Sequence, residues 1–300
     1  MAQTKIQISS GEKVLNIINI VIVTFFLLCC IYPFYYILIG SISSPSAVSE
    51  GLSFLPRQIT FSTFGKLFEK GDIGNAFFIS IARTVLGTVI CVLASSFFAY
   101  LVTKQEMIGR KFVFRFVIVT MYFNAGLIPW YITMKTFGLK NSFLLYIIPG
   151  AVQAFYIILV KTFIEELPAS MEESASLDGA GFFMIFFKII LPLSKPIIAT
   201  IAVYCAVGQW NTWTDNYFLV TNPRLQTLQV ILYKYLTAAE NIARSMSSGM
   251  GVNMANMSNA ITPTSVQMCI TVVTVLPIML VYPFLQKQFA KGIMMGAVKG

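Results

Sequence analysis

Residues 14 to 49 carry no charged side chain, and this run leaves few folds open. A helix rises about 1.5 Å per residue, so about 20 apolar residues cross a hydrocarbon core of about 30 Å. Across the 300 residues, 57% are hydrophobic and 11% are charged. In soluble proteins about a quarter of the residues are charged. The sequence therefore predicts an all-α, polytopic membrane protein.

Six apolar runs are long enough to serve as spans. They lie at about 14–39, 77–102, 116–134, 141–160, 197–213 and 266–285. The third is interrupted by Asn124-Ala125-Gly126, and residues 1–13 and 286–300 form polar ends. Basic residues collect next to spans in the cytoplasm. Such residues follow the second run at Lys104, Arg110, Lys111 and Arg115. We therefore expect both termini and the loop 165–195 in the cytoplasm.

The loop 165–195 is too acidic to lie in lipid. Five of the chain's twelve acidic residues fall within its first fourteen positions: Glu165, Glu166, Glu172, Glu173 and Asp178. Pro168 suits a first helical turn, and Ser170 with Glu173 predicts a capping box. Gly179 predicts the end of this short helix, because glycine adopts a positive φ without steric cost. A second helix is expected from Phe182 to Ile190.

The first loop helix is predicted to be amphipathic. Leu167, Met171 and Ala175 recur every four residues and so share one face. A short helix with an apolar stripe, on the aqueous side of a membrane protein, needs a surface that covers the stripe. That surface is either the lipid headgroup layer or another protein.

The motif in this loop resembles the EAA loop of the membrane subunits of bacterial ABC importers. The matching runs are Glu173-Ser174-Ala175, Asp178-Gly179-Ala180 and Ile189-Ile190-Leu191-Pro192. Ser174 stands where the family has alanine. The resemblance implies six transmembrane helices of the type I importer permease fold. It also implies that the first loop helix is a coupling helix, with Leu167, Met171, Glu173, Ser174, Ala175, Asp178, Gly179 and Ala180 at the contact with an ATPase subunit.

The C-terminal tail is similar to that of the maltose-type sugar permeases, closest to the branch of the YtcP and LplC type. The matching positions are Phe289, Lys291, Gly292, Gly296, Lys299 and Gly300. In this family the tail reaches between the two ATPase subunits. The alternative for the tail is a basic anchor on anionic lipid. The resemblance further implies a second homologous permease, two ABC ATPase subunits that bind ATP and Mg²⁺, and an extracellular solute-binding protein that delivers a carbohydrate.

A substrate path is suggested by the sequence at the end of the fifth run. Sugars offer C–H faces to aromatic rings and hydroxyls to amides and carboxylates, and this segment supplies both. The candidate residues in this segment are Gln209, Trp210, Asn211, Trp213 and Asp215, and Asn124 in the third run is a further candidate. On a helix, Trp210 and Trp213 would share a face and form one aromatic wall. The alternative is an aromatic belt at the membrane interface.

Composition argues against chemistry in this chain. Histidine is absent, and the five cysteines lie in apolar runs without metal-ligand spacing, so we expect no catalytic residue, metal site or cofactor. The net charge of +9 comes without basic runs interleaved with aromatics, so no nucleic acid is expected. Arg83 lies near the outer end of the second run, where its long side chain is expected to reach the headgroups. A secondary transporter would need ionisable residues deep in its spans, and the sequence places none there. An ABC permease for a non-sugar solute stays open.

Overall fold

The computed structural model describes residues 10–49, 51, 54–69, 72–247 and 264–280. These residues form helices joined by turns and loops, and no strand occurs among them, so the all-α prediction is confirmed. Contacts within the chain divide the protein into two compact units. The first unit takes its residues from the ranges 1–67 and 235–273, and the second unit from 68–234 and 274–300.

The helices of the described residues vary widely in length. In chain order they are α1 (Ser10–Ile42), α2 (Pro45–Ser49), α3 (Ser62–Glu69), α4 (Asp72–Thr103), α5 (Arg110–Thr120), α6 (Leu127–Thr136), η1 (Phe143–Tyr146), α7 (Ala154–Glu165), α8 (Ser170–Leu177), α9 (Phe182–Ile185), η2 (Phe186–Ile190), α10 (Leu191–Leu193), α11 (Lys195–Asn211), α12 (Thr214–Leu219), η3 (Pro223–Leu225) and α13 (Leu228–Ser247). A further apolar helix, Thr264–Leu280, follows.

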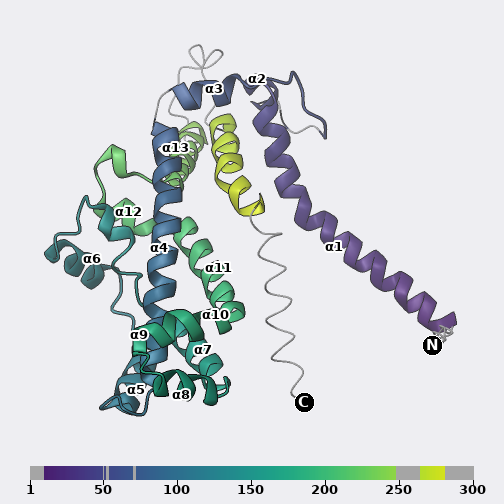
Figure 1. The fold of residues 1–300 in the computed structure, drawn as a ribbon. Helices are drawn as coiled ribbons and strands as arrows, with labels where there is room; N and C mark the ends of the chain where they lie inside the picture. Colours follow the sequence, from purple (N-terminus) through teal and green to yellow (C-terminus); the bar gives the residue numbers. More distant parts are fainter. Residues whose placement is uncertain (1–9, 50, 52–53, 70–71, 248–263, 281–300) are drawn as a thin grey trace. The chain divides into compact units, whose positions relative to one another are not determined.

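Helix α4 is the centre of the second unit. It packs along both α7 and α11, and Figure 1 shows α4 and α11 side by side. Cys91, Ser95 and Ala99 recur every four residues on α4 and are fully buried. Small side chains at this spacing allow helices to approach closely. The hydroxyl of Ser95 accepts a hydrogen bond from the backbone N–H of Gln153, just before α7, at 3.1 Å.

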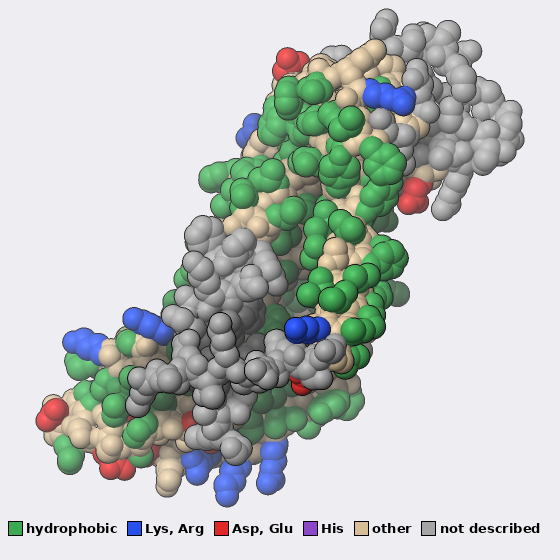
Figure 2. All heavy atoms as spheres, turned by 90° about the vertical axis from the view of Figure 1, so that its right-hand side faces the viewer, with side chains coloured by type: hydrophobic (Ala, Val, Ile, Leu, Met, Phe, Trp, Pro, Cys, Tyr) green, Lys and Arg blue, Asp and Glu red, His purple; other side chains and the backbone are tan. Residues whose placement is uncertain are grey.

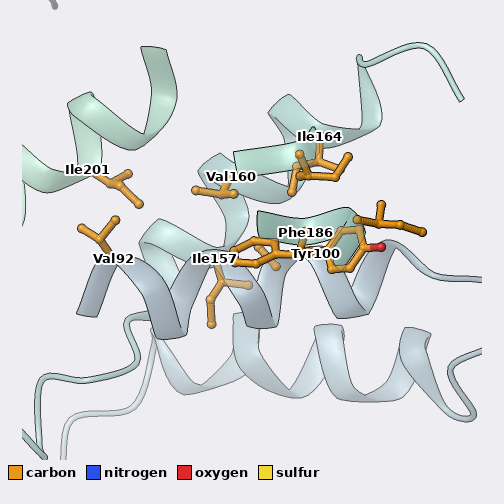
Figure 3. Close-up of a cluster of buried hydrophobic side chains, with 10 residues drawn as sticks. Val92, Tyr100, Ile157, Val160, Ile164, Phe186 and Ile201 are labelled. Atoms are coloured by element: carbon orange, nitrogen blue, oxygen red, sulfur yellow. The ribbon is translucent and has the colours of Figure 1, made fainter. Parts of the chain in front are cut away.

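A hydrophobic core joins α4 to the elements that pack against it. Figure 3 shows its side chains pointing toward one another from α4, α7, η2 and α11. Its buried members include Val92, Tyr100, Ile157, Val160, Ile164, Phe186 and Ile201. Because η2 belongs to the loop after α7, this core ties the loop 165–195 directly to the helices α4 and α11.

Two of the described helices are long and apolar enough to cross a membrane: the segments Gly11–Ile42 and Ile73–Thr103. The pair Phe182–Leu193 and Lys195–Asn211 would form a third span, but it bends by 86°. Pro192 and Pro196 flank this bend, and each removes a backbone donor that a continuous helix needs. Figure 2 shows apolar side chains over most of the coloured surface, as expected of surfaces that face lipid or protein. The count of six spans stays a prediction.

The predicted third and fourth spans are not single continuous helices. The third breaks between α5 and α6, where Gly126 has a φ of 81°, at the interruption visible in the sequence. The fourth consists of η1, a non-helical stretch and α7, which extends past residue 160 to Glu165. Pro149 lies in that stretch, and proline disfavours helical geometry both at itself and at the residue before it.

In the first unit, α1 meets the helix Thr264–Leu280 at a glycine. A Cβ added to Gly40 would collide with the end of the Met268 side chain, so a larger residue there would require that flexible side chain to shift. Nearby, the thiol of Cys269 donates a hydrogen bond to the carbonyl of Ser41 at 3.3 Å. Residues 281–285, the end of the predicted sixth span, lie outside the described residues.

Candidate functional site

A cavity of about 340 Å³ lies in the second unit, between α4, α11 and the break in the fourth predicted span. Its lining includes two amides, Gln153 and Gln209, and five aromatic or charged side chains: Arg83, Trp130, Tyr146, Tyr156 and Asp215. Pro149 and Gly150 contribute irregular backbone to the wall. Non-helical backbone at membrane depth is tolerated where it lines a cavity, which accounts for the break.

Arg83 and Asp215 form a buried ion pair at one side of this cavity. Two guanidinium nitrogens of Arg83 donate to the carboxylate of Asp215 at 2.6 and 3.1 Å. The Nε of Arg83 donates to Gln209 Oε1 at 3.1 Å, and Nη1 also donates to the carbonyl of Thr212 at 3.1 Å. Arg83 therefore ties α4 to the end of α11 and to α12.

The position of Arg83 corrects two expectations. From the sequence, this arginine was expected near the outer end of its span, reaching toward the headgroups, and no ionisable residue was expected deep in a span. Arg83 is only 3% exposed and lies eleven residues inside α4. Burial of such a charge requires a partner of opposite sign. That partner, Asp215, is 132 residues away in sequence, so no local pattern indicated it.

A second hydrogen-bond network supports the ion pair. The guanidinium carbon of Arg83 lies 4.7 Å from the ring centroid of Tyr146. The Tyr146 hydroxyl donates to the carbonyl of Leu225 at 2.5 Å and accepts from the amide of Asn216. That amide also donates to the Leu225 carbonyl at 3.0 Å. These contacts fix η1, α12 and η3 around Arg83.

Two of the predicted path residues, Gln209 and Asp215, line the cavity. A Cβ on Gly87 would lie 2.7 Å from Gln209 Nε2, and one on Gly150 would lie 3.3 Å from it. The amide of Gln209 therefore fits between two glycines, one on α4 and one in the broken span. Its Oε1 accepts from Arg83, so the side chain is held in place.

The predicted aromatic wall does not form. Helix α11 ends at Asn211 and α12 begins at Thr214, so Trp213 lies between the two helices and does not share a helical face with Trp210. Trp210 is buried away from the cavity lining, packs edge-to-face on Phe77 and donates to the carbonyl of Thr274 at 3.0 Å. Trp213 stacks on Tyr233 at 4.2 Å between ring centroids.

The two polar candidates next to these tryptophans also lie outside the cavity lining. Asn211 is exposed and accepts a hydrogen bond from Gln229 at 3.3 Å. Asn124 is exposed and accepts from the backbone N–H of Gly126 at 2.9 Å.

In the loop 165–195, α8 ends in the glycine turn that the sequence predicts. Gly179 has a φ of 83°. Its N–H donates to the carbonyl of Ser176, and the N–H of Ala180 donates to the carbonyl of Ala175, both at 3.0 Å. This pair of bonds is the Schellman motif, which satisfies carbonyls at a helix end. The capping box was wrong: Ala169 precedes the helix with helical dihedrals, and no side chain caps its start.

The apolar face of α8 differs from the prediction. Leu167, Ala175 and Ala180 pack against the chain's own hydrophobic core. Met171 is 48% exposed and Leu177 is 89% exposed, so these two are the apolar side chains that α8 offers outward. Glu173, Ser174 and Asp178 are exposed as well. The periodicity indicated an apolar face correctly, but most of it covers the body of the protein.

Glu172 is a functional candidate that the sequence reasoning missed. The hydroxyl of Tyr100, in α4, donates to Glu172 Oε1 at 2.7 Å, and Lys104 forms an ion pair with the same oxygen. The available signal was the basic cluster after the second apolar run, of which Lys104 is the first member. The predicted tail residues, Phe289, Lys291, Gly292, Gly296, Lys299 and Gly300, lie outside the described residues.

Comparison with known proteins places this geometry in a family. Residues 92–295 match the family described as binding-protein-dependent transport system inner membrane component. The chain belongs to this family. It is thus a transporter membrane subunit, and the loop 165–195 with its Gly179 turn lies inside the matched region.

Individual relatives of this permease span nearly the whole chain. It is 35% identical over 278 residues to the polygalacturonan/rhamnogalacturonan transport system permease protein YtcP of Bacillus subtilis, covering 92% of this chain and 94% of that one. It is 34% identical to the protein LplC of the same organism, covering 90% of each. The predicted likeness to the YtcP and LplC type is therefore confirmed.

A solved structure agrees with the fold of the permease. A chain in the crystal structure of a bacterial ABC transporter involved in the import of the acidic polysaccharide alginate superimposes with a TM-score of 0.82. The two are 33% identical, and the match covers 93% of this permease and 98% of that chain. The type I ABC importer permease fold is therefore confirmed.

Proposed function

We propose that this permease takes up an oligosaccharide delivered by an extracellular solute-binding protein. It does so beside a second homologous permease, above two ABC ATPase subunits that bind ATP and Mg²⁺. It lies in the bacterial cell membrane with both termini and the loop 165–195 in the cytoplasm. The relatives' names support a carbohydrate, because they include a permease for polygalacturonan and one for melibiose, raffinose and stachyose.

The observation that carries this proposal is the composition of the cavity wall. Trp130 offers an aromatic face for the C–H surface of a sugar, while Gln153 and Gln209 offer amides for hydroxyls. Arg83 and Asp215 compensate each other, so these two lining charges leave no net charge to attract a bare ion. A cavity of about 340 Å³ falls within the usual range of small-molecule sites.

The loop supplies the connection to ATP hydrolysis. Met171 and Leu177, the outward apolar side chains of α8, fit a hydrophobic groove on an ATPase subunit, and the exposed Glu173 and Asp178 suit basic residues at its rim. The Gly179 turn and the core beneath α8 make the loop stiff enough to pass on a rigid-body displacement.

Reconstitution of the complete transporter tests the proposal. The permease, its partner permease and the ATPase subunits are placed in liposomes with the binding protein outside and ATP inside. We expect uptake of a labelled oligosaccharide, with raffinose and an oligogalacturonate as the two probes. A labelled amino acid tests the alternative of a non-sugar solute. A proton ionophore should leave uptake unchanged, since ATP drives the cycle.

A further inference from the structure

Glu172 joins the coupling helix α8 to the end of α4. Its side chain is 25% exposed, whereas its neighbour Glu173 is exposed. One carboxylate oxygen accepts from the Tyr100 hydroxyl at 2.7 Å and pairs with the ammonium of Lys104. That ammonium lies 4.1 Å from the centroid of the Tyr100 ring, so the three groups form a closed set.

The α4 side of this contact is held rigidly. Tyr100 is fully buried, and its ring centroid lies 5.6 Å from that of Phe186 in the core. The Lys104 side chain is 12% exposed, which is low for a residue type that is mostly found in water. Arg110 donates to the carbonyl of Thr103 at 3.0 Å and so closes the last turn of α4. A buried hydroxyl with fixed neighbours gives Glu172 a defined place to dock.

We propose that Glu172 is a positioning residue that makes α8 and α4 move together during transport. Displacement of the loop by the ATPase subunits then reaches the cavity through α4. That helix carries Arg83 seventeen residues from Tyr100, or about 25 Å along its axis. Among the described residues, Glu172 is the side chain of α8 that forms hydrogen-bonded or ionic contacts with the α4 end. The inference rests on the proposed function.

The test compares charge-neutralised variants in the reconstituted transporter. Glu172→Gln and Lys104→Gln each remove the ion pair between these two residues. The double variant removes the same single ion pair. The matched control is Glu165→Gln, which breaks the ion pair between Lys161 and Glu165 at the end of α7. The readouts are sugar imported per ATP hydrolysed and the amount of ATPase subunit that copurifies with the permease.

We expect both single variants to import about two- to fivefold less sugar per ATP, the range for a partly screened ion pair. The double variant should be no worse than the more affected single variant, because both act through one contact. The Glu165→Gln control should match the wild type.

Three outcomes would overturn the proposal. In the first, Glu172→Gln retains the wild-type ratio of sugar to ATP. In the second, the effects of the two single variants multiply in the double variant. In the third, Glu172→Gln loses its ATPase subunits, which would make Glu172 a docking residue. A wild-type complex that imports no sugar would instead count against the proposed function.

Discussion

Replacing Asp215 by asparagine should destabilise the permease strongly while changing few atoms. The side chains of Arg83 and Asp215 are 4% and 10% exposed, so neither charge is well solvated. Asparagine retains an oxygen that can accept from Arg83, but it leaves the guanidinium without a counter-charge. The variant therefore isolates the electrostatic part of the contact.

The magnitude follows from this burial. Two unit charges about 4 Å apart interact by about 4 kcal/mol at an effective dielectric constant of about 20. Removing one partner of a buried pair costs about 3–5 kcal/mol, because the other charge stays buried and uncompensated. We expect a loss near the lower end, about 3 kcal/mol, because the asparagine oxygen keeps a hydrogen bond.

The assay is an SDS titration of the purified permease in mixed micelles, followed by the fluorescence of its three tryptophans. Glu165→Gln is the control, because the Glu165 side chain is 51% exposed and its ion pair should contribute about 0.5 kcal/mol or less. The double variant Arg83→Met, Asp215→Leu should recover most of the stability, since no charge is then buried. It should still import poorly, because Gln209 loses its partner. A loss for Asp215→Asn no larger than that of the control would refute the reasoning.

Three further predictions concern topology, coupling and the sugar path. A cysteine placed at Ala180 should react with an impermeant reagent in inside-out vesicles only, and labelling from outside intact cells would contradict the topology. Gly179→Asp should insert normally but lose uptake, because a side chain at a φ of 83° strains the turn by about 1 kcal/mol or more. The control Gly181→Ala should transport normally, because Gly181 has a φ of −75°. At equal membrane abundance, Gln209→Ala should change the uptake ratio of two sugars. Trp210→Ala should lower only abundance, and the reverse pattern would favour Trp210 in the path.

The turn in the loop 165–195 could be predicted from the sequence because its determinants are local. A glycine after a short acidic helix specifies a positive φ within a few residues, and the structure has that turn at Gly179. The capping box failed because Ala169 is already helical. The apolar face of α8 was correctly indicated, but periodicity alone cannot tell whether a chain's own core or a partner covers such a face.

The cavity could not be predicted in the same way because its parts meet only in the folded chain. Arg83 and Asp215 pair across 132 residues. On its own, Arg83 looked like an interfacial charge and Asp215 like a sugar contact. The aromatic wall assumed that the fifth span stays helical through Trp213, but the helix ends at Asn211. Composition indicates that a segment can lie in a membrane, but not where its helix stops.

The 86° bend before α11 has a consequence for the size of the transport stroke. From Lys195 to Gln209 the helix runs fourteen residues, about 21 Å. If the short arm α9–α10 rocks by about 10° and the angle is kept, Gln209 travels about 4 Å, since displacement grows with distance along a rigid helix. A small rotation of the loop would therefore move the cavity end of α11 by more than the length of a hydrogen bond, enough to break a contact between Gln209 and a sugar hydroxyl.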